Sequence, residues 1–117
     1  MPETDGKIIL YQTDNGKVAV DVRFKDETFW LTQKAMAELF DVESHTITYH
    51  LQEIFRTDEL EEAATTRKFR AVQKEGSRNV ERDLQFYNLD AVIAVGYRVN
   101  SKKATRFRQW ATKTLKE

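Results

Sequence analysis

The sequence predicts an α+β domain in which a small antiparallel sheet packs against helices. Three observations support this class. Residues 18–24 alternate apolar and polar side chains, residues 32–55 repeat apolar side chains at helical spacing, and residues 67–87 resemble two strands around a Gly-containing turn. The chain has 117 residues, 40% of them apolar, which is enough for one domain with one modest core.

Residues 1–31 are predicted to form the small antiparallel sheet. Ile8 to Tyr11 is a short apolar run, and the turn signal Asp14-Asn15-Gly16 follows it. Over residues 18–24 the valines and Phe24 alternate with Ala19, Asp21 and Arg23, as expected of a strand with one buried and one solvated side. The segment continues with a turn at 25–28 and a short strand at 29–31. Such a hairpin is marginal in water alone, so it must pack on helices.

Residues 32–55 are predicted to form a helix-turn-helix. Thr32 is a suitable N-cap for a first helix that ends before the turn Asp41-Val42-Glu43. Ser44 is the expected cap of the second helix. The buried faces are formed by Ala35, Met36, Leu39 and Phe40 on the first helix and by Ile47, Leu51, Ile54 and Phe55 on the second. In proteins that use this motif on DNA, the second helix lies in the major groove.

The outward side of the second helix carries hydrogen-bonding side chains that are suited to base edges. The residues predicted to read bases are His45, Thr46, Thr48, Tyr49 and Gln52. None of them is Lys or Arg, which is unusual for a helix that reads a groove. The alternative is a helical hairpin that packs for stability or against a partner protein.

Residues 67–87 are predicted to form a basic β-hairpin with its turn around Gly76. Such a ribbon could lie along a phosphate backbone or enter a groove as a wing. Its cations are Arg67, Lys68, Arg70, Lys74, Arg78 and Arg82. The alternative is a solvated surface hairpin whose charges keep it soluble and blunt its edge.

Residues 88–117 are predicted to form two helices that close the core. Asn88 caps an apolar helix that Gly96 ends in the C′ position, and Ser101 caps the last helix. Ala104, Phe107, Ala111 and Leu115 form one apolar stripe on that helix. The last helix is still amphipathic at Glu117, so we expect this single domain to be the N-terminal part of a longer protein.

Charge is divided unevenly along the chain, although the formal net charge is zero. Residues 1–66 carry a net charge of −8 and residues 67–117 a net charge of +8. This asymmetry suggests a polyanionic partner for the second half, or else pairing between the halves or between neighbouring subunits. The residues predicted to bind DNA phosphates are Lys34, Arg70, Lys74, Arg78, Arg82 and Arg106.

No catalytic or cofactor-binding constellation is recognisable, so we predict that the domain is not an enzyme. His45 and His50 are five residues apart, which turns them roughly 140° from one another on a helix, and without Cys they make a poor metal site. The four Gly residues are scattered and form no phosphate-binding loop. We therefore expect no cofactor, metal or small-molecule ligand.

The chain has neither an apolar run of membrane-spanning length nor a secretory leader at its polar N-terminus. No membrane association is expected, and the predicted location is the cytoplasm.

The second half resembles the virulence-associated RhuM family. The resemblance rests on Arg67 to Leu115, RKFRAVQKEGSRNVERDLQFYNLDAVIAVGYRVNSKKATRFRQWATKTL, within which YNLDAVIAVGYRVNS is highly specific. The front part, VDVRFKDETFWLTQKAMAELFDVESHTITYHLQEIF, is similar to that family too. The resemblance implies a bacterial protein of pathogenicity islands and other mobile elements. Members usually continue beyond this length.

More distantly, the order of elements is similar to the Bro-N and KilA-N domains of phage and large-virus antirepressors, which implies DNA binding. Some RhuM relatives carry a further domain, including relatives of the Fic/Doc fold. The HPFxxGN motif of Fic enzymes is missing from this chain, so the resemblance implies no such activity.

The function that we predict from sequence is therefore a non-enzymatic DNA-binding domain of a mobile-element or virulence-associated transcription regulator. One short helix reads few base pairs, so a homodimer on paired half-sites is a natural extension. The alternative is a protein-interaction module that positions a C-terminal effector domain. A third, weaker idea is an accessory domain of a nuclease or transferase whose active site lies elsewhere.

Overall fold

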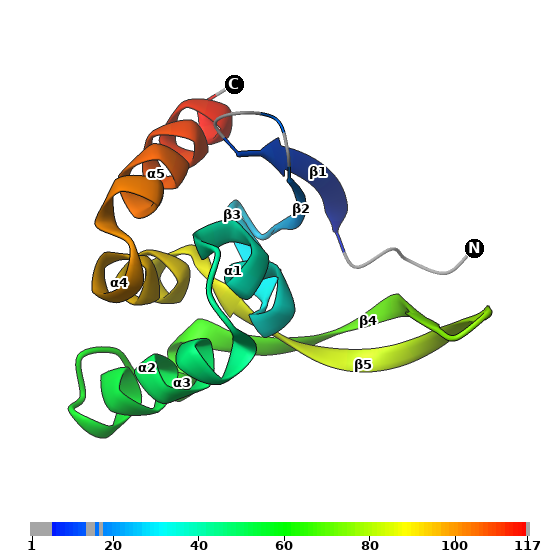
Figure 1. Ribbon diagram of the computed structural model, residues 1–117, viewed down its shortest axis with the longest axis horizontal. Helices are drawn as coiled ribbons and strands as arrows, with labels where there is room; N and C mark the ends of the chain where they lie inside the picture. Colours follow the sequence, from blue (N-terminus) through cyan, green and yellow to red (C-terminus); the bar gives the residue numbers. More distant parts are fainter. Residues whose placement is uncertain (1–5, 14–15, 17, 117) are drawn as a thin grey trace.

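The computed structural model describes residues 6–13, 16 and 18–116, and Figure 1 shows its strands and helices in chain order. The elements are β1 (Lys7–Gln12), β2 (Ala19–Lys25), β3 (Thr28–Thr32), α1 (Gln33–Phe40), α2 (Ser44–Arg56), α3 (Glu62–Thr65), β4 (Thr66–Glu75), β5 (Arg78–Asn88), α4 (Leu89–Val99) and α5 (Ser101–Leu115). The predicted α+β class is confirmed. Residues 14 and 15 of the predicted first turn lie outside the described residues.

All five strands belong to one antiparallel sheet in the order β1-β2-β3-β5-β4. The sequence suggested an N-terminal sheet and a separate basic hairpin. They are joined by β3 and β5, which pair Trp30 with Asn88, Leu31 with Tyr87 and Thr32 with Phe86. The N-terminal hairpin, which would be marginal alone, is therefore supported by a further strand pair as well as by helices.

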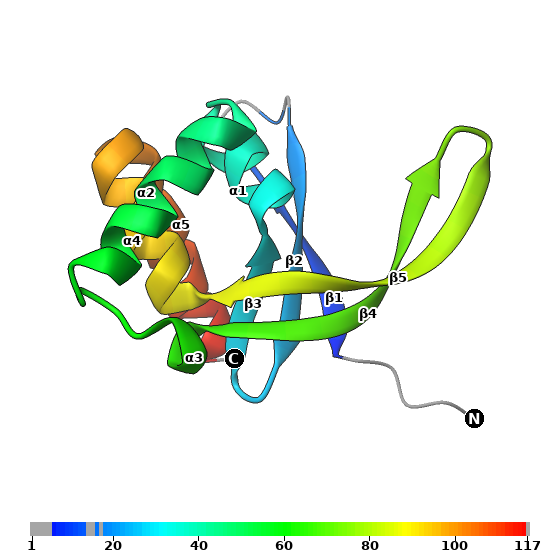
Figure 2. The same ribbon diagram turned by 90° about the horizontal axis from the view of Figure 1, so that it is seen from below.

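The β4–β5 hairpin is longer than the rest of the sheet and projects from the body as an arm (Figure 2). Its ladder pairs every residue from Thr66 with Tyr87 to Glu75 with Arg78. Gly76 has a φ of 63° in the two-residue turn, a left-handed conformation that glycine adopts without steric cost. The predicted hairpin and the position of its turn are confirmed.

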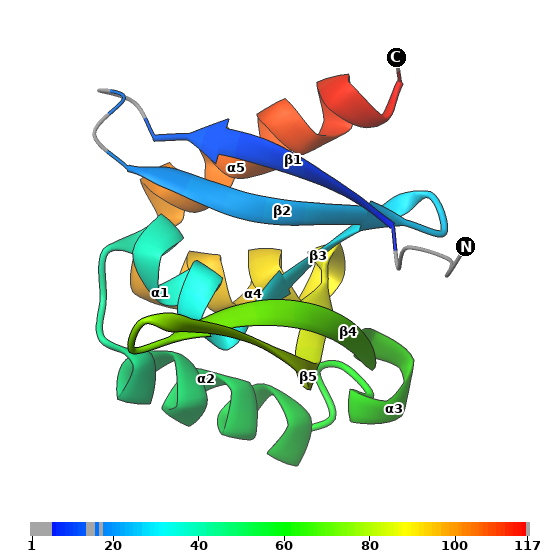
Figure 3. The same ribbon diagram turned by 90° about the vertical axis from the view of Figure 1, so that its right-hand side faces the viewer.

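The main core lies between helices and one face of the β1–β2–β3 part of the sheet. Figure 3 shows β1 and β2 in front with α4 and α5 behind them, so the near face of these strands carries no helix. Phe29 of β3 stacks on Trp110 of α5 at 5.1 Å between ring centroids, and Tyr11 meets the edge of Phe107 at 5.1 Å. These rings fasten the last helix to the first strands.

Two predicted helix caps are confirmed and two are shifted by one residue. The side chains of Thr32 and Asn88 accept hydrogen bonds from the backbone N–H groups of Ala35 and Ala91, at 3.1 Å each. Ser44 does not cap α2. It is the first helical residue after Glu43, which makes no side-chain cap. Ser101 likewise lies inside α5, because the Asn100 side chain accepts the bond from the Lys103 N–H instead.

Gly96 does not end α4, contrary to the sequence prediction. The helix continues to Val99, and Gly96 is fully inside it. A Cβ at this position would lie 2.6 Å from Cζ of Phe40 and 2.7 Å from Cβ of Ala104. Gly96 is thus required by the close approach of α1 and α5 to α4, a reason that a local sequence pattern does not contain.

Arg23 is buried, although the alternation of β2 predicted a solvated side chain. It is 8% exposed, and its guanidinium carbon lies 4.9 Å from the ring centre of Phe86 and 5.4 Å from that of Phe69. The two rings form a second, smaller apolar cluster with Trp30 at the base of the arm. Arg23 is therefore covered because the arm folds over the helix-free face of β2, with cation–π contacts to its rings.

Within the described residues, no helix combines the length and the apolar character that crossing a membrane would require.

Replacing Gly96 with Ala should lower the free energy of unfolding by about 1–3 kcal/mol, because the added methyl group overfills the junction of α1, α4 and α5. This loss is expected even though Ala is favoured over Gly in a helix by ~1 kcal/mol. Urea titration followed by circular dichroism measures the change.

Phe40→Leu provides the matching test, because it removes the ring atoms that the new methyl group would meet. In the Phe40→Leu background, Gly96→Ala should cost less than in the wild type. Equal costs in both backgrounds would show that the ring of Phe40 does not determine the need for glycine.

Candidate nucleic-acid interface

Helices α1 and α2 are joined by a three-residue turn, as the sequence predicted. Asp41 ends α1 in the left-handed region, with φ 57° and ψ 52°. The backbone N–H groups of Asp41 and Val42 both donate to the carbonyl oxygen of Ala37, the latter at 3.1 Å. This αL ending reverses the chain tightly and sets α2 across α1. Asp is among the few non-glycine residues that tolerate such angles.

Helix α2 buries one side and leaves the other in solvent. Ile47, Leu51 and Ile54 are buried against the main core, as expected from their spacing. On the opposite side His45, Tyr49 and Gln52 are exposed, Tyr49 to 58% of its surface. Thr46 is half-buried. Exposed hydrogen-bonding side chains on one stripe of a helix are available to a partner surface.

Thr48, a predicted base reader, is already engaged within the helix pair. It is half-buried, and the amide nitrogen of Gln33 at the start of α1 donates a hydrogen bond to its hydroxyl oxygen. The same amide nitrogen donates to the carbonyl oxygen of Ser44 at 3.1 Å, and the Thr48 hydroxyl donates to that carbonyl at 3.2 Å. Gln33 and Thr48 therefore tie the start of α2 to α1. Sequence patterning did not identify Gln33.

The exposed side of α2 carries few charges, and its one arginine is paired. His45 lies 3.7 Å from the carboxylate of Glu43. Arg56 pairs with Glu53 at 2.7 Å, and these hydrogen bonds hold the pKa of the Glu53 carboxyl below its usual value. Both pairs are exposed and contribute little to stability. No cation of α2 is thus placed alone at the centre of the exposed stripe, in agreement with the sequence.

The cations of the arm are divided between its two sides. Residues opposite one another in the ladder share a side, and so do residues two apart. Arg70 and Lys74 therefore belong to one side of the ribbon, whereas Arg78 and Arg82 belong to the other. Arg70 lies 3.6 Å from Asp83. Arg82 is held by the carboxylate of Glu75 through two hydrogen bonds, which keep the pKa of that carboxyl below its usual value.

Three of the predicted phosphate-binding cations are exposed without an ion pair in the described part of the chain: Lys34, Lys74 and Arg78. Arg106 lies on α5 beside Tyr11, and Figure 1 shows α5 and α2 at opposite ends of the body. The structure thus does not bring Arg106 together with the exposed side of α2.

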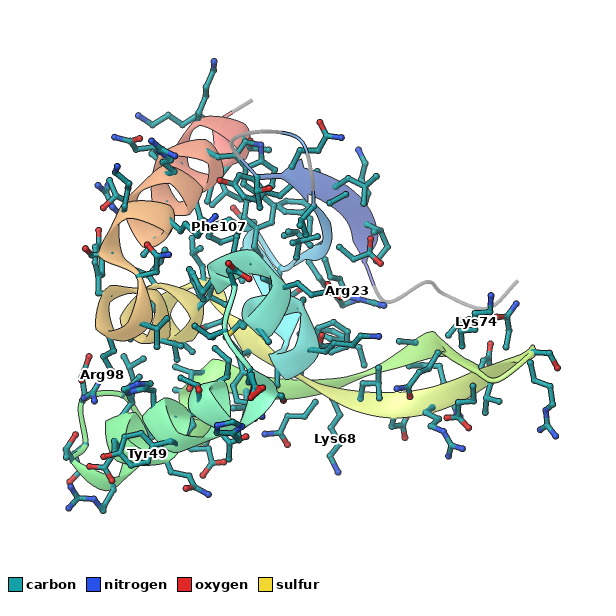
Figure 4. All side chains as sticks on the ribbon, viewed as in Figure 1. Arg23, Tyr49, Lys68, Lys74, Arg98 and Phe107 are labelled. Carbon is teal, nitrogen blue, oxygen red and sulfur yellow. The ribbon has the colours of Figure 1, made fainter. Side chains whose placement is uncertain are left out.

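Lys68 is an exposed cation at the base of the arm. In Figure 4 the Lys68 side chain points downward from β4 near the body, whereas Lys74 lies toward the tip and points upward. Lys68 is exposed and, among the described residues, has no ion pair. Lys68, Arg70 and Lys74 share one side of the ladder, so the different directions of Lys68 and Lys74 reflect the twist of the two-stranded arm.

Part of the charge asymmetry is neutralised inside the molecule. Arg67 of the basic half pairs with Asp26 of the acidic half, and Arg98 pairs with Glu59 at 2.9 Å. In Figure 4 Arg98 lies on the side of α4 that faces α2. The two halves are thus partly self-complementary, which was the alternative to a polyanionic partner.

Residues 64–117 match the model of the Virulence protein RhuM family. The resemblance to this virulence-associated family is therefore confirmed for the segment that contains the β4–β5 hairpin, α4 and α5. The match covers a little under half of the chain, and α1 and α2 lie outside it.

No curated protein and no solved structure matches the chain. The distant similarity to Bro-N and KilA-N domains is accordingly not shown.

The left-handed angles of Asp41 give a test of the turn between α1 and α2. Asp41→Gly should keep or raise the free energy of unfolding, because glycine adopts these angles without a steric penalty. Asp41→Val should lower it by about 1–2 kcal/mol, the cost of a left-handed L-residue, or more because Val is β-branched. Thermal and urea unfolding measure both changes.

Asp90→Gly is the control, because Asp90 lies in the first turn of α4 with helical geometry. It should be destabilising, since glycine is unfavourable inside helices. A loss of stability in Asp41→Gly as large as that in Asp90→Gly would contradict this account of the turn.

Proposed function

We propose that this chain is a non-enzymatic DNA-binding domain of a mobile-element or virulence-associated transcription regulator. Helices α1 and α2 act as a helix-turn-helix, with α2 in the major groove. The observation that carries the proposal is the exposed stripe of α2, with His45, Tyr49 and Gln52, in a molecule whose projecting hairpin carries exposed cations such as Lys68.

The contacts divide into base reading and phosphate binding. Gln52 and His45 are suited to base edges, and Tyr49 can contact either a base or a phosphate. Lys68 and Lys74 of β4, with Lys34 at the start of α1, are the cations assigned to phosphates. Arg78 at the tip adds a contact if the arm bends along the backbone. Arg70 and Arg82 are already close to carboxylates, so each would exchange an intramolecular partner for a phosphate.

A protein-interaction module is the second candidate, and a specific observation favours it. The exposed stripe of α2 carries an aromatic ring, Tyr49, flanked by the pairs His45–Glu43 and Arg56–Glu53, with no cation at its centre. Exposed Tyr is frequent at protein interfaces. The carboxylates beside the stripe would repel a phosphate backbone, but they can pair with the cations of a protein partner of mixed charge.

The salt dependence of binding to random duplex DNA separates the two candidates. Each phosphate contact should contribute roughly one unit to the slope of log affinity against log salt. Fluorescence polarisation at several salt concentrations should show steep weakening. Lys68→Glu combined with Lys74→Glu should weaken binding to all sequences and lower the slope by about 2.

Lys113→Glu is the charge-matched control, because Lys113 lies near the end of α5, away from α2. It should reduce affinity far less than Lys68→Glu. Absence of binding at low salt, or binding that does not change with salt, would remove the DNA proposal and favour the protein-interaction module.

Gln52 gives a test of base reading by α2. A Gln side chain that bonds an adenine contributes roughly 1–3 kcal/mol of discrimination, which is about 5–150-fold in affinity. Gln52→Ala should therefore lose preference at one base pair of a selected duplex while its affinity for random duplex stays close to that of the wild type.

Selection from a randomised duplex library, compared between the two proteins, measures this preference. The control is Thr112→Ala, a polar residue exposed on α5. An identical preferred sequence for Gln52→Ala and the wild type would exclude Gln52 as a base reader.

A further inference from the structure

A groove lies between β2 and the β4–β5 arm, at the place where β3 ends and α1 begins. It is lined by Ala19 and Asp21 of β2, by the start of α1, and by Glu81 and Leu84 of β5. In Figure 3, β2 and the arm lie on either side of α1. The groove therefore follows the line along which β3 would continue between its two neighbouring strands if the chain did not turn into α1 at Gln33.

The two strands beside the groove each have a backbone edge that no strand of the described residues covers. Strand β5 pairs with β4 from Arg78 to Tyr87, but with β3 only from Phe86 to Asn88. Strand β2 pairs with β1 from residue 19 onward, but with β3 only over residues 23–25. The inner edge of β5 over residues 78–85 is the longer of the two, and it presents N–H and C=O groups to an additional strand.

One side of the groove is apolar. Ile8 lies opposite Arg23 in the ladder, so both belong to the helix-free side of the sheet. On the same side, Ala71 and Leu84 of the arm pack on the small apolar cluster that Arg23 covers. Ile8 is 51% exposed although it faces this groove. Alternate side chains of a strand beside β5 would meet these aliphatic groups.

The charged side chains that line the groove are nearly balanced. They are the cations Arg23, Lys34, Arg70 and Lys74 and the carboxylates Asp21, Glu38 and Glu81. Asp83, at 3.6 Å from Arg70, adds a further carboxylate beside it. A nucleic acid requires an excess of cations, which this groove does not offer. The charge pattern is instead complementary to a segment that has polar side chains and no net charge.

We propose that the groove binds an extended peptide segment of a partner protein, which pairs antiparallel with residues 78–85 of β5. Aliphatic side chains at every second position of the peptide contact Ile8 and Leu84, and the side chains between them are polar without net charge. Main-chain hydrogen bonds supply most of the affinity of such an added strand. The groove volume of about 1210 Å³ exceeds the roughly 300–1,000 Å³ of small-molecule pockets, which also favours a peptide.

Fluorescence polarisation with labelled peptides and the 117-residue chain tests the proposal. The probe is KTVTVTVTE, which alternates valine with threonine and has no net charge. Two further peptides carry N-methyl groups on all valines or on all threonines, because successive N–H groups of a strand point to opposite edges. The unmodified peptide should bind saturably. At least one N-methylated peptide should bind tenfold more weakly or worse, since it cannot donate hydrogen bonds to β5.

Ile8→Asn tests the apolar side of the groove. It should weaken binding of the unmodified peptide roughly 4- to 12-fold, because about half of the Ile8 side chain becomes covered in the complex. The matched control is Leu10→Asn. Leu10 is 60% exposed on the same face of β1, but it is not among the described residues that line the groove. Leu10→Asn should therefore bind the peptide as the wild type does.

Absence of saturable binding to the wild type would overturn the proposal. Equal binding of all three peptides would overturn it too, and so would equal losses in Ile8→Asn and Leu10→Asn. If Ile8→Asn fails to fold by circular dichroism, amide hydrogen exchange of the wild type replaces it. The peptide should then protect amides of residues 78–85, and unchanged protection would overturn the proposal. A wild type that dimerises and thereby excludes the peptide would assign the groove to a second copy instead.

This proposal does not rest on DNA binding, and the two fail separately. Ile8→Asn changes no charge and leaves Lys34 and Lys74 in place, so it should bind random duplex with the wild-type affinity and salt slope. The DNA proposal is thus judged on the salt titration, and the peptide groove on the N-methylated peptides and on Ile8→Asn.

Discussion

The pairing of β3 with β5 is the constraint on which the rest of the structure depends. It joins segments more than fifty residues apart and makes one sheet of the N-terminal strands and the basic hairpin. The same strands end at Thr32 and Asn88, which are the N-caps of α1 and α4. A three-residue ladder therefore fixes the start of both helices, and through α1 it also sets the position of α2.

The base of the arm is held on the other side of the sheet by a different interaction. Arg23 lies against Phe69 and Phe86, while Trp30 meets the edge of Phe69 at 5.4 Å between ring centroids. A buried guanidinium on aromatic faces combines apolar burial with electrostatic attraction. The arm is thus anchored at its base by the apolar cluster and solvated toward its tip, where its charged side chains face outward.

Ion pairs in the folded chain neutralise part of the charge that separates the acidic half of the sequence from the basic half. Arg67 and Arg98 each cross that division to an acidic residue, and Arg82 is held by Glu75 within the hairpin. Among the described residues, exposed cations without an ion pair remain on the arm, at the start of α1 and along α5, for example Lys68, Lys34 and Lys113. The DNA interface is proposed for α2, the start of α1 and the arm, and α5 with Arg106 is outside it.

The sequence by itself determined the order and type of the elements other than the short helix α3, because these follow from local periodicity, turn residues and the caps Thr32 and Asn88. Apolar spacing likewise predicted that His45, Tyr49 and Gln52 face outward from α2. Tertiary structure alone decided that Gly96 lies inside a helix, that Arg23 is buried, that Thr48 is bound by Gln33, and that Arg106 is remote from α2. Each of these depends on which distant segment packs against the residue, and a local pattern cannot contain that information.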